Sequence, residues 1–401
     1  MKPCILPKLA TDLTCTGCAA CRNICPHDAI SMTPDKEGFL MPVVNTDLCV
    51  KCRLCEKICP VISGTDLKHQ QADRVFAFWD NRSRTKSSSG GAFSAIARKI
   101  ISKEGVVFGA ALQDDFRLKH IKCENMDDLE PLRGSKYLQS YIGLTFADAK
   151  KILKAGRQVL FTGTPCQVAG LRSFLQVPYE NLTTVDIICH GVPSNELFCN
   201  YIRLLKSEFP KYAFADDFEF RNRHGWGLAS SVTGRNGCKM PLTGVTNLYM
   251  RCFQRASIFR KSCYDCQFNG LSRVSDITIG DFWGIGKIGI PFRHDVTKGV
   301  SMVMANTGKG RRIMSSIDGC FMEERPLREA VVNNHNLVGS SCLPSDRDRI
   351  IEAFNSRFTL TEIDRQFHIT DRSIKSVLLN MLVQMGVFWK IKSIINKIRN
   401  L

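Results

Sequence analysis

Cysteines at a repeated spacing dominate the first sixty residues and have the clearest chemistry in the chain. Two runs read Cys-x2-Cys-x2-Cys-x3-Cys-Pro, one from Cys15 to Pro26 and one from Cys49 to Pro60. Thiolates at these intervals suit two cubane 4Fe-4S clusters, in which the fourth cysteine of each run binds the opposite cluster. The spacing therefore predicts one cluster on Cys15, Cys18, Cys21 and Cys59, and another on Cys49, Cys52, Cys55 and Cys25.

Zinc is the alternative metal for these cysteines. Paired Cys-x2-Cys steps are also typical of zinc sites, which take four ligands in a tetrahedron. A third Cys-x2 step followed by x3-Cys-Pro, present twice, is superfluous for zinc. Because the residue before a proline is held extended, Cys25 and Cys59 are directed away from their own loops, as an exchange between two clusters requires. The pattern favours iron-sulfur clusters.

Composition indicates a protein of two or three domains in a reducing compartment. The chain has 401 residues, of which 44% are hydrophobic and 19 are cysteine. The first residues lack the apolar stretch and cleavage site of a signal peptide, so we expect a cytoplasmic protein whose cysteines bind metal. No window reaches the roughly 18 consecutive apolar residues of a spanning helix.

The net charge favours acidic partners. A formal charge of +17 would attract an acidic ferredoxin or other redox partner subunit, a phosphorylated coenzyme or an anionic lipid surface. Nucleic acid is the remaining partner for a basic protein. The sequence has no helix-turn-helix, zinc-finger or RNA-binding motif, so we predict no nucleic-acid binding.

The remaining pattern predicts the order of the domains. Two short strands, 30–32 and 39–44, complete an α+β ferredoxin-like two-cluster module over residues 1–65. A strand at 75–79 and a helix at 92–101 open the next region, which extends to 150. Helices and strands then alternate over 151–345, as in a parallel α/β domain. Residues 346–401 are expected to form a helical, basic C-terminal tail.

Two loops have the composition of an anion or cofactor site. Ser89-Gly90-Gly91 precedes the helix at 92–101, where glycines let a phosphate or flavin edge approach free backbone N–H groups; an ordinary capped turn explains the same residues. The second loop, Gly134-Ser135-Lys136-Tyr137, follows Arg133 and combines a turn with cations and an aromatic ring. This loop suits an anionic cofactor, or equally a solvated turn.

A third set of cysteines is spread over three segments. Cys166 follows the turn Gly163-Thr164-Pro165, and Cys189 follows the strand 184–188. Both stand at the carboxyl ends of predicted parallel strands, where open α/β sheets place their ligands. With Cys263 and Cys266 they supply four sulfur ligands, which suit a third cubane, a zinc ion or buried free thiols. Cys252 is near enough in sequence to Cys263 to be a rival ligand.

Three further polar residues lie beside these segments. His190 is a candidate proton donor, although a single histidine is more often structural. Asp276 and Asp281 flank a strand that runs into a glycine-rich corner, and they suit either cofactor positioning or capping of a strand turn. The sequence leaves the catalytic residue unknown.

Several of these motifs together resemble the coenzyme F420 hydrogenase/dehydrogenase beta-subunit family. The resemblance covers roughly residues 75–345 and rests on five motifs in order: Ser89-Gly90-Gly91, Gly163-Thr164-Pro165-Cys166-Gln167, Cys189-His190-Gly191, Cys263-x2-Cys266 and the segment from Asp276 to Gly284. It implies FAD and a 4Fe-4S cluster on Cys166, Cys189, Cys263 and Cys266. It also implies flavin contacts from Ser89, Gly90, Gly91, Gly134, Ser135, Lys136 and Tyr137. Further candidate cofactor-binding residues are Gly163, Thr164, His190, Asp276 and Asp281.

The resemblance implies an oxidoreductase. Clusters carry one electron and a flavin carries two, so a row of clusters leading to FAD converts single electrons into pairs. We expect electrons from a ferredoxin or partner subunit to reach a small acceptor, either a deazaflavin such as F420 or another heterocycle. Two other hypotheses are an electron-transfer subunit without its own catalysis, and a zinc-stapled scaffold.

The end of the chain has its own pattern. Thr359 and Glu362 form the capping box of one helix, and a basic amphipathic helix is predicted over 387–399. Such a helix suits contact with an anionic membrane from the cytoplasmic face, or packing on the protein's own body.

Overall fold

A computed structural model gives the fold of the chain. It describes residues 6–63, 67, 71–72, 74–222, 225–371, 373–374, 378, 381–383 and 387. The basic helix predicted over 387–399 lies, apart from Val387, outside the described residues. Within the described part, no helix has the length and apolar character needed to cross a bilayer.

The N-terminal module contains two short helices and a hairpin. The helices are α1 (Ala20–Ile24) and α2 (Leu54–Lys57), and the antiparallel strands are β1 (Ile30–Pro34) and β2 (Leu40–Val44). In the turn between the strands, the Asp35 carboxylate accepts hydrogen bonds from the backbone N–H groups of Glu37 and Phe39, both at 2.9 Å. The hairpin therefore has a rigid tip.

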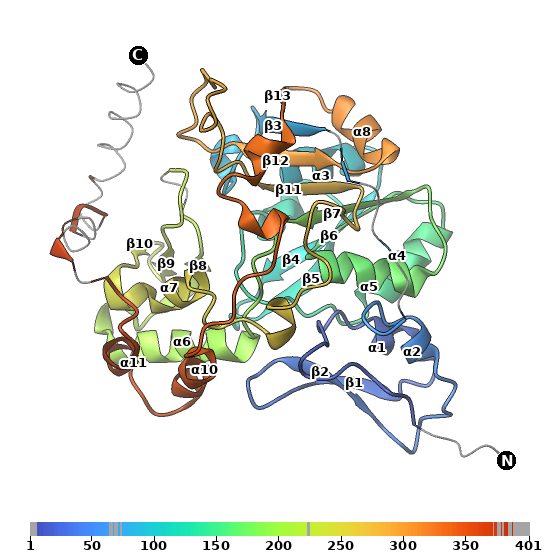
Figure 1. Cartoon of the computed structure of the whole chain (residues 1–401), viewed down its shortest axis with the longest axis horizontal. Helices are drawn as coiled ribbons and strands as arrows, with labels where there is room; N and C mark the ends of the chain where they lie inside the picture. The colour runs from blue at the N-terminus through green and yellow to red at the C-terminus, as the bar shows by residue number, and fades with distance from the viewer. Residues whose placement is uncertain are drawn as a thin grey trace.

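One sheet of eight strands organises the rest of the chain (Figure 1), in the order β13-β3-β12-β11-β7-β6-β4-β5. Its four central strands, β11, β7, β6 and β4, are parallel, and the outer strands pair antiparallel. The strands are β3 (Val75–Asp80), β4 (Val106–Leu112), β5 (Leu118–Cys123), β6 (Val159–Gly163), β7 (Leu182–Ile187), β11 (Ile277–Asp281), β12 (Ser301–Ala305) and β13 (Cys320–Arg325).

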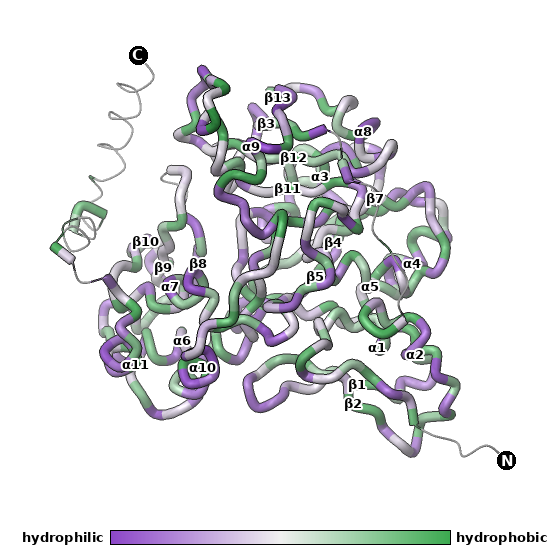
Figure 2. Tube along the Cα trace, viewed as in Figure 1, coloured by the Kyte–Doolittle hydropathy of each residue, from purple (hydrophilic) through white to green (hydrophobic). Residues whose placement is uncertain are grey.

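Helices cover both faces of this sheet. On one face, α4 (Thr145–Lys154) and α5 (Pro165–Leu175) pack on alternate residues of β4 and β6, and α1 of the N-terminal module packs outside them. On the other face lie α3 (Ala92–Ile101) and α8 (Gly308–Ser315). Figure 2 shows the hydrophobic colouring of the segment around α1, where it meets α5.

A second lobe packs beside the sheet. Its core joins a small antiparallel sheet, ordered β10-β9-β8, to helices from two distant parts of the chain. The elements are β8 (Ala215–Glu219), β9 (Ser231–Gly234), β10 (Lys239–Pro241), α6 (Asn195–Glu208), α7 (Leu248–Gln254), α10 (Arg347–Asn355) and α11 (Leu360–Phe367); the short α9 (Leu327–Val331) follows β13.

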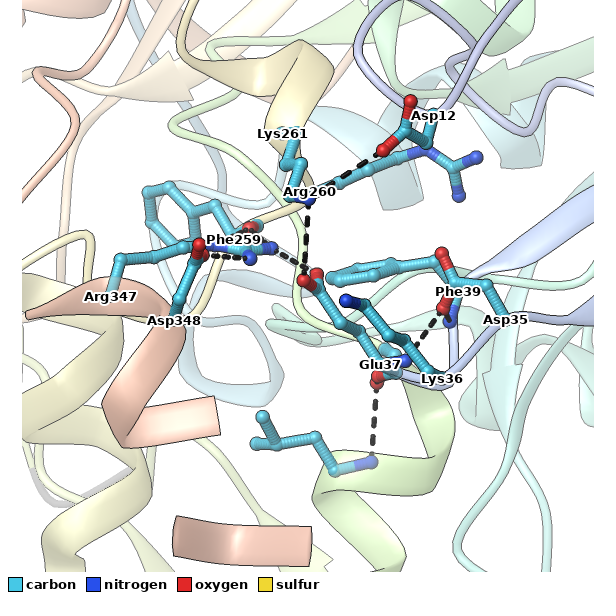
Figure 3. Close-up of polar contacts among 12 residues, drawn as sticks. Asp12, Asp35, Lys36, Glu37, Phe39, Phe259, Arg260, Lys261, Arg347 and Asp348 are labelled. Atoms are coloured by element: carbon cyan, nitrogen blue, oxygen red, sulfur yellow. Dashed lines mark hydrogen bonds and ion pairs between the residues drawn. The ribbon is translucent and has the colours of Figure 1, made fainter. Parts of the chain in front are cut away.

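Ion pairs and hydrogen bonds join the tip of the N-terminal hairpin to this lobe (Figure 3). Glu37 lies between two cations, with a carboxylate oxygen 2.7 Å from Arg347 and the other 3.6 Å from Lys261. The backbone oxygen of Glu37 accepts a hydrogen bond from Ser194 Oγ at 2.9 Å. Phe39 is buried behind these contacts at 2% exposure. The module is thus held by buried charges as well as by its packing on α5.

The strands predicted for the sheet are present, but the structure does not follow two of the predicted domain boundaries. The sequence divides this region at residue 150, whereas β4 and β6, from either side of that point, are neighbours in one sheet. The predicted tail also begins inside the second lobe, because the buried faces of α10 and α11 belong to its core. The capping box at Thr359 and Glu362 forms as expected.

Candidate iron-sulfur and cofactor site

The eight cysteines of the repeat line two small cavities in the N-terminal module. Four surround one cavity together with Thr16, and four surround the other together with His27 and Arg53. The first set is Cys15, Cys18, Cys21 and Cys59, and the second is Cys25, Cys49, Cys52 and Cys55. These are the two sets that the spacing predicts, with the fourth cysteine exchanged between the runs.

The two cysteine loops repeat in backbone conformation as well as in sequence. Ala19 and Arg53, each four residues after the first cysteine of its run, adopt left-handed conformations with φ of 61° and 60°. Each of them directly precedes a short helix, α1 or α2. Left-handed backbone is uncommon outside glycine, so its recurrence at matched positions indicates a common loop geometry around each cavity.

The third set of cysteines also meets around one cavity. Cys166, Cys189, Cys263 and Cys266 line it, at the carboxyl ends of β6 and β7. Thr164 Oγ1 lies 3.1 Å from the Cys166 sulfur at the start of α5. Cys252, the rival ligand, is buried in the core of the second lobe and does not line this cavity.

Among the described residues, no three His, Cys, Asp or Glu side chains form a group suited to a single metal ion. Each set of four cysteines lines one small cavity, and four thiols are the ligand set of a 4Fe-4S cubane.

Burial raises the pKa of several thiols in these sets. In the third cavity, burial and then repulsion from Cys263 raise the pKa of Cys189 well above its ordinary value. Burial, followed by repulsion from Cys266, raises the pKa of Cys166 to about 11. In the first cavity, burial raises the pKa of Cys21 to about 12. Ligands of this kind ionise when they bind metal, and the metal compensates their desolvation.

Thr16 separates the first cavity from the third. It is a lining residue of both, and its Oγ1 atom is buried without a hydrogen-bond partner in the described part of the chain. On one side of it stands Cys15, and Cys166 lies on the other. The Cys55 thiol of the second cavity is close enough to the Cys21 thiol of the first to help raise its pKa. The cavities therefore form a series from the second, which holds the exposed Cys52, through the first to the third.

The glycine-rich turn predicted to contact a cofactor is packed against the sheet. A side chain at Gly90 would collide with the backbone of Phe78 and Ser301, and Ser89 Oγ donates to the Val300 oxygen at 3.0 Å. Gly91, with φ of 89°, precedes α3 in a left-handed conformation. Neighbouring backbone, and not a cofactor, therefore fills the space that the missing side chain of Gly90 leaves.

The second predicted loop lies beside this turn. The Ser135 N–H donates to Ser88 Oγ at 2.9 Å, and Gly134 is left-handed, with Ser88 Oγ 3.8 Å from the position of a Cβ there. Lys136 points back along its own loop, with Nζ 2.6 Å from the Arg133 oxygen. Ser88 and Gly134 bring the two predicted loops together.

Tyr137, Asp281 and Arg221 form a cluster near the third cavity. The Arg221 side chain is 2% exposed, and its guanidinium contacts both Asp281 carboxylate oxygens, at 2.5 and 3.1 Å. Trp226 Nε1 donates to the same carboxylate at 2.6 Å. Burial lowers the pKa of Arg221, but the charge of Asp281 outweighs it and raises that pKa above the ordinary value. Burial raises the pKa of Tyr137, which the Arg221 charge opposes.

Aromatic rings surround this cluster. Tyr137 contacts the rings of Phe220 and Phe253, with centroids 5.9 and 4.6 Å away, and Trp226 stacks on Trp283 at 4.7 Å. His190, which lines the third cavity, lies 6.4 Å from the Phe253 ring. Burial, and then the charge of His335, lower the pKa of His190. The cluster thus adjoins the third set of cysteines.

Asp276 lies at the other end of the same strand. It precedes β11, and its carboxylate accepts hydrogen bonds from the backbone and side chain of Thr184, both at 2.9 Å, and from Thr307 at 2.8 Å. Asp281 ends that strand. Of the two predicted aspartates, the structure brings only Asp281 to the cysteine-lined edge, and Asp276 has the capping role.

Two matches to protein families cover most of the candidate ligands. Residues 14–62 match the 4Fe-4S dicluster domain, and residues 156–329 match the C terminus of the coenzyme F420 hydrogenase/dehydrogenase beta subunit. The chain joins an iron-sulfur dicluster domain to an F420 beta-subunit domain. The resemblance predicted from the motifs is confirmed. The F420 beta-subunit domain includes the four cysteines of the third cavity, and the dicluster domain includes the other eight.

Two curated relatives of the chain carry F420 in their names. The chain is 21% identical over 231 residues to a protein of Methanosarcina mazei named as one of the subunits of F420H2 dehydrogenase, and the match covers 52% of this chain and 66% of the relative. It is 24% identical over 323 residues to the coenzyme F420-dependent sulfite reductase of Methanocaldococcus jannaschii, covering 77% of this chain and 47% of the relative. The chain thus spans about two thirds of one relative and about half of the other.

A solved structure also resembles the chain. It belongs to the F420-reducing nickel-iron hydrogenase complex of Methanosarcina barkeri, at 16% identity and a TM-score of 0.45, covering 76% of this chain and 94% of that one.

The sequence did not predict Thr16, Arg221 or Trp226. Thr16 directly follows the predicted ligand Cys15, and this position in the sequence is the signal that could have identified it. Arg221 and Trp226 precede Asp281 by more than fifty residues, in a segment without a motif, and only the fold brings them to it.

Proposed function

We propose that this protein is an oxidoreductase that passes electrons through three 4Fe-4S clusters to FAD and on to a small acceptor. The observation that carries the proposal is the series of three four-cysteine cavities, with Thr16 forming a wall between the first and the third. Clusters exchange single electrons and a bound flavin exchanges two, so this order suits conversion of single electrons into pairs. Cys52 is exposed, which suits electron entry from a ferredoxin or partner subunit.

The cluster around Asp281 suits the flavin. Tyr137, Phe220 and Phe253 supply aromatic rings beside the third cavity, and the Arg221–Asp281 ion pair fixes polar groups next to them. The neighbouring Asn222 has a buried Oδ1 atom without a partner among the described residues, which is free to accept from a ring N–H. These rings and the amide oxygen suit a planar heterocycle. A deazaflavin such as F420 is the acceptor that the names of the relatives favour.

Metal and flavin content test the proposal. The chain purified without oxygen should contain about twelve iron atoms, four for each cluster, and a releasable yellow flavin. Cys189→Ser should lose about a third of the iron, whereas Cys252→Ser, another buried cysteine, should keep it. A wild-type chain with about eight iron atoms, or a Cys189→Ser variant with unchanged iron, would eliminate the third cluster.

Two aspartates test where the flavin binds. Asp281→Asn weakens the ion pair with Arg221 and should lower the flavin content, while Asp276→Asn, at the opposite end of β11, should keep full occupancy. Equal flavin content in the two variants would place the flavin elsewhere.

A role in electron transfer within a larger complex is the second candidate. One relative is named as part of a multisubunit dehydrogenase. Dithionite-driven reduction of F420 by the purified chain separates the two functions. Reduction without any partner supports the enzyme, and its absence with clusters and flavin fully loaded supports the electron-transfer role.

A further inference from the structure

Arg260 is a buried cation at the junction of the first and third cavities. It is 2% exposed and belongs to the largest completely buried side chains of the described structure. Its backbone N–H donates to the Val192 oxygen at 2.9 Å, and its own oxygen accepts from the Cys263 N–H at 2.9 Å. The backbone of Arg260 is therefore fixed between two segments that line the third cavity.

The side chain of Arg260 extends into the N-terminal module. Its Nε donates to the Cys15 oxygen at 2.6 Å, and its two terminal nitrogens reach the Gln139 side-chain oxygen and the Leu40 oxygen, each at 3.1 Å. A side chain at Gly17 would lie only 3.0 Å from the guanidinium. The cation is thus packed directly against the first cysteine loop.

Arg260 differs from comparable arginines in its lack of a carboxylate. Arg273 and Arg347 are buried to the same degree, and each has a carboxylate partner, Asp186 at 3.1 Å and Glu37 at 2.7 Å. All the oxygens that Arg260 contacts are neutral, and no ion pair with it occurs in the described part of the chain. Completely buried charges are rare in proteins unless they are paired.

The missing negative charge is available from the proposed clusters. An oxidised cubane with four thiolates carries about two net negative charges, and the cysteines of the first and third cavities would hold one such group on each side of Thr16. We propose that Arg260 is the countercharge shared by the first and third clusters, and that it makes both easier to reduce; this rests on the proposed function. Each reduction adds one electron and no proton, so a fixed positive charge stabilises the reduced form.

The proposed second cluster serves as an internal reference for the reduction potentials of the other two. Its cavity lies in the module beyond the first, and Arg260 contacts none of its lining residues among the hydrogen bonds of the described chain. Removal of the Arg260 charge should therefore affect two of the three clusters.

Redox titration monitored by electron paramagnetic resonance tests this assignment. The anaerobic holoprotein is compared with Arg260→Gln, which removes the charge, Arg260→Lys, which keeps it, and Lys261→Gln, which removes a neighbouring charge that is paired with Asp12 and Glu37. In Arg260→Gln the reduction equilibrium constant of two clusters should fall at least tenfold, a 59 mV lowering for a one-electron couple. Arg260→Lys and Lys261→Gln should leave all potentials within half that shift.

The outcomes separate this inference from the proposed function. Unchanged potentials in an Arg260→Gln protein with full iron would overturn the inference, as would an Arg260→Lys protein shifted equally. Loss of iron in both Arg260 variants would assign the residue to holding the loops, which also overturns it. A wild-type protein without clusters at the first and third sites would instead refute the proposed function, and the countercharge with it.

Discussion

Replacing Glu37 with glutamine should loosen the N-terminal hairpin from the second lobe. Arg347, 1% exposed, donates to the Phe259 oxygen at 2.6 and 3.0 Å and pairs with Glu37 at 2.7 Å. Its other carboxylate partner, Asp348, is 73% exposed. Glutamine keeps the shape of Glu37 but leaves Arg347 with its charge only partly compensated.

The size of the effect follows from burial. Breaking a fully buried ion pair by removing one partner costs about 3–5 kcal/mol. Because the Glu37 side chain is 12% exposed and Asp348 remains, we expect about 2–3 kcal/mol for the free energy of local opening. That change lowers hydrogen-exchange protection of the hairpin amides roughly 30- to 150-fold.

Hydrogen exchange of the anaerobic protein, followed by mass spectrometry over β1 and β2, measures this opening. Asp12→Asn is the matched control, because it removes the other carboxylate partner of Lys261, at 3.5 Å and 60% exposure. An exposed pair of this kind contributes about 1 kcal/mol or less. If Glu37→Gln and Asp12→Asn exchange alike, the hairpin is not held by its buried charge.

Two further predictions concern a glycine and a histidine. Gly17→Ala should lose iron from the first site, because φ is 68° and the new Cβ would lie 2.5 Å from Gln139 Nε2, whereas Gly237→Ala, with φ of 73° and open space, should keep all iron in the same assay. His120, 8% exposed, has its pKa lowered to about 4 by burial. The unfolded chain therefore binds the extra proton first as pH falls below about 6.5, so stability is complete above that pH and decreases by up to about 3 kcal/mol toward pH 4. Urea denaturation from pH 7 to 5 should show this loss, and His120→Gln should flatten the dependence; a slope that persists in the variant would assign it to other groups.

The sequence predicts which cysteines line the first two cavities because these residues are close together in the chain. Eight ligands lie within two short loops, so spacing alone specifies which thiols meet. The third set spans a hundred residues, yet Cys166 and Cys189 could be paired because parallel strands end at one edge of a sheet.

Long-range features were harder to predict. Asp276 and Asp281 flank the same strand, and only the parallel pairing of β11 with β7 shows which of them reaches the cysteine-lined edge. The division at residue 150 failed because β4 and β6 pair across it. Arg260 lies three residues before the predicted ligand Cys263, but the sequence does not show that its guanidinium is buried. Only the fold shows this, together with the lack of a carboxylate partner among the described residues.

The most direct test of the three-cluster account is an anaerobic reductive titration that counts electrons. Each cluster takes one electron and a flavin takes two, so the purified chain should accept about five electrons from dithionite. A chain that accepts only about two, with no flavin bleaching, would contradict the account.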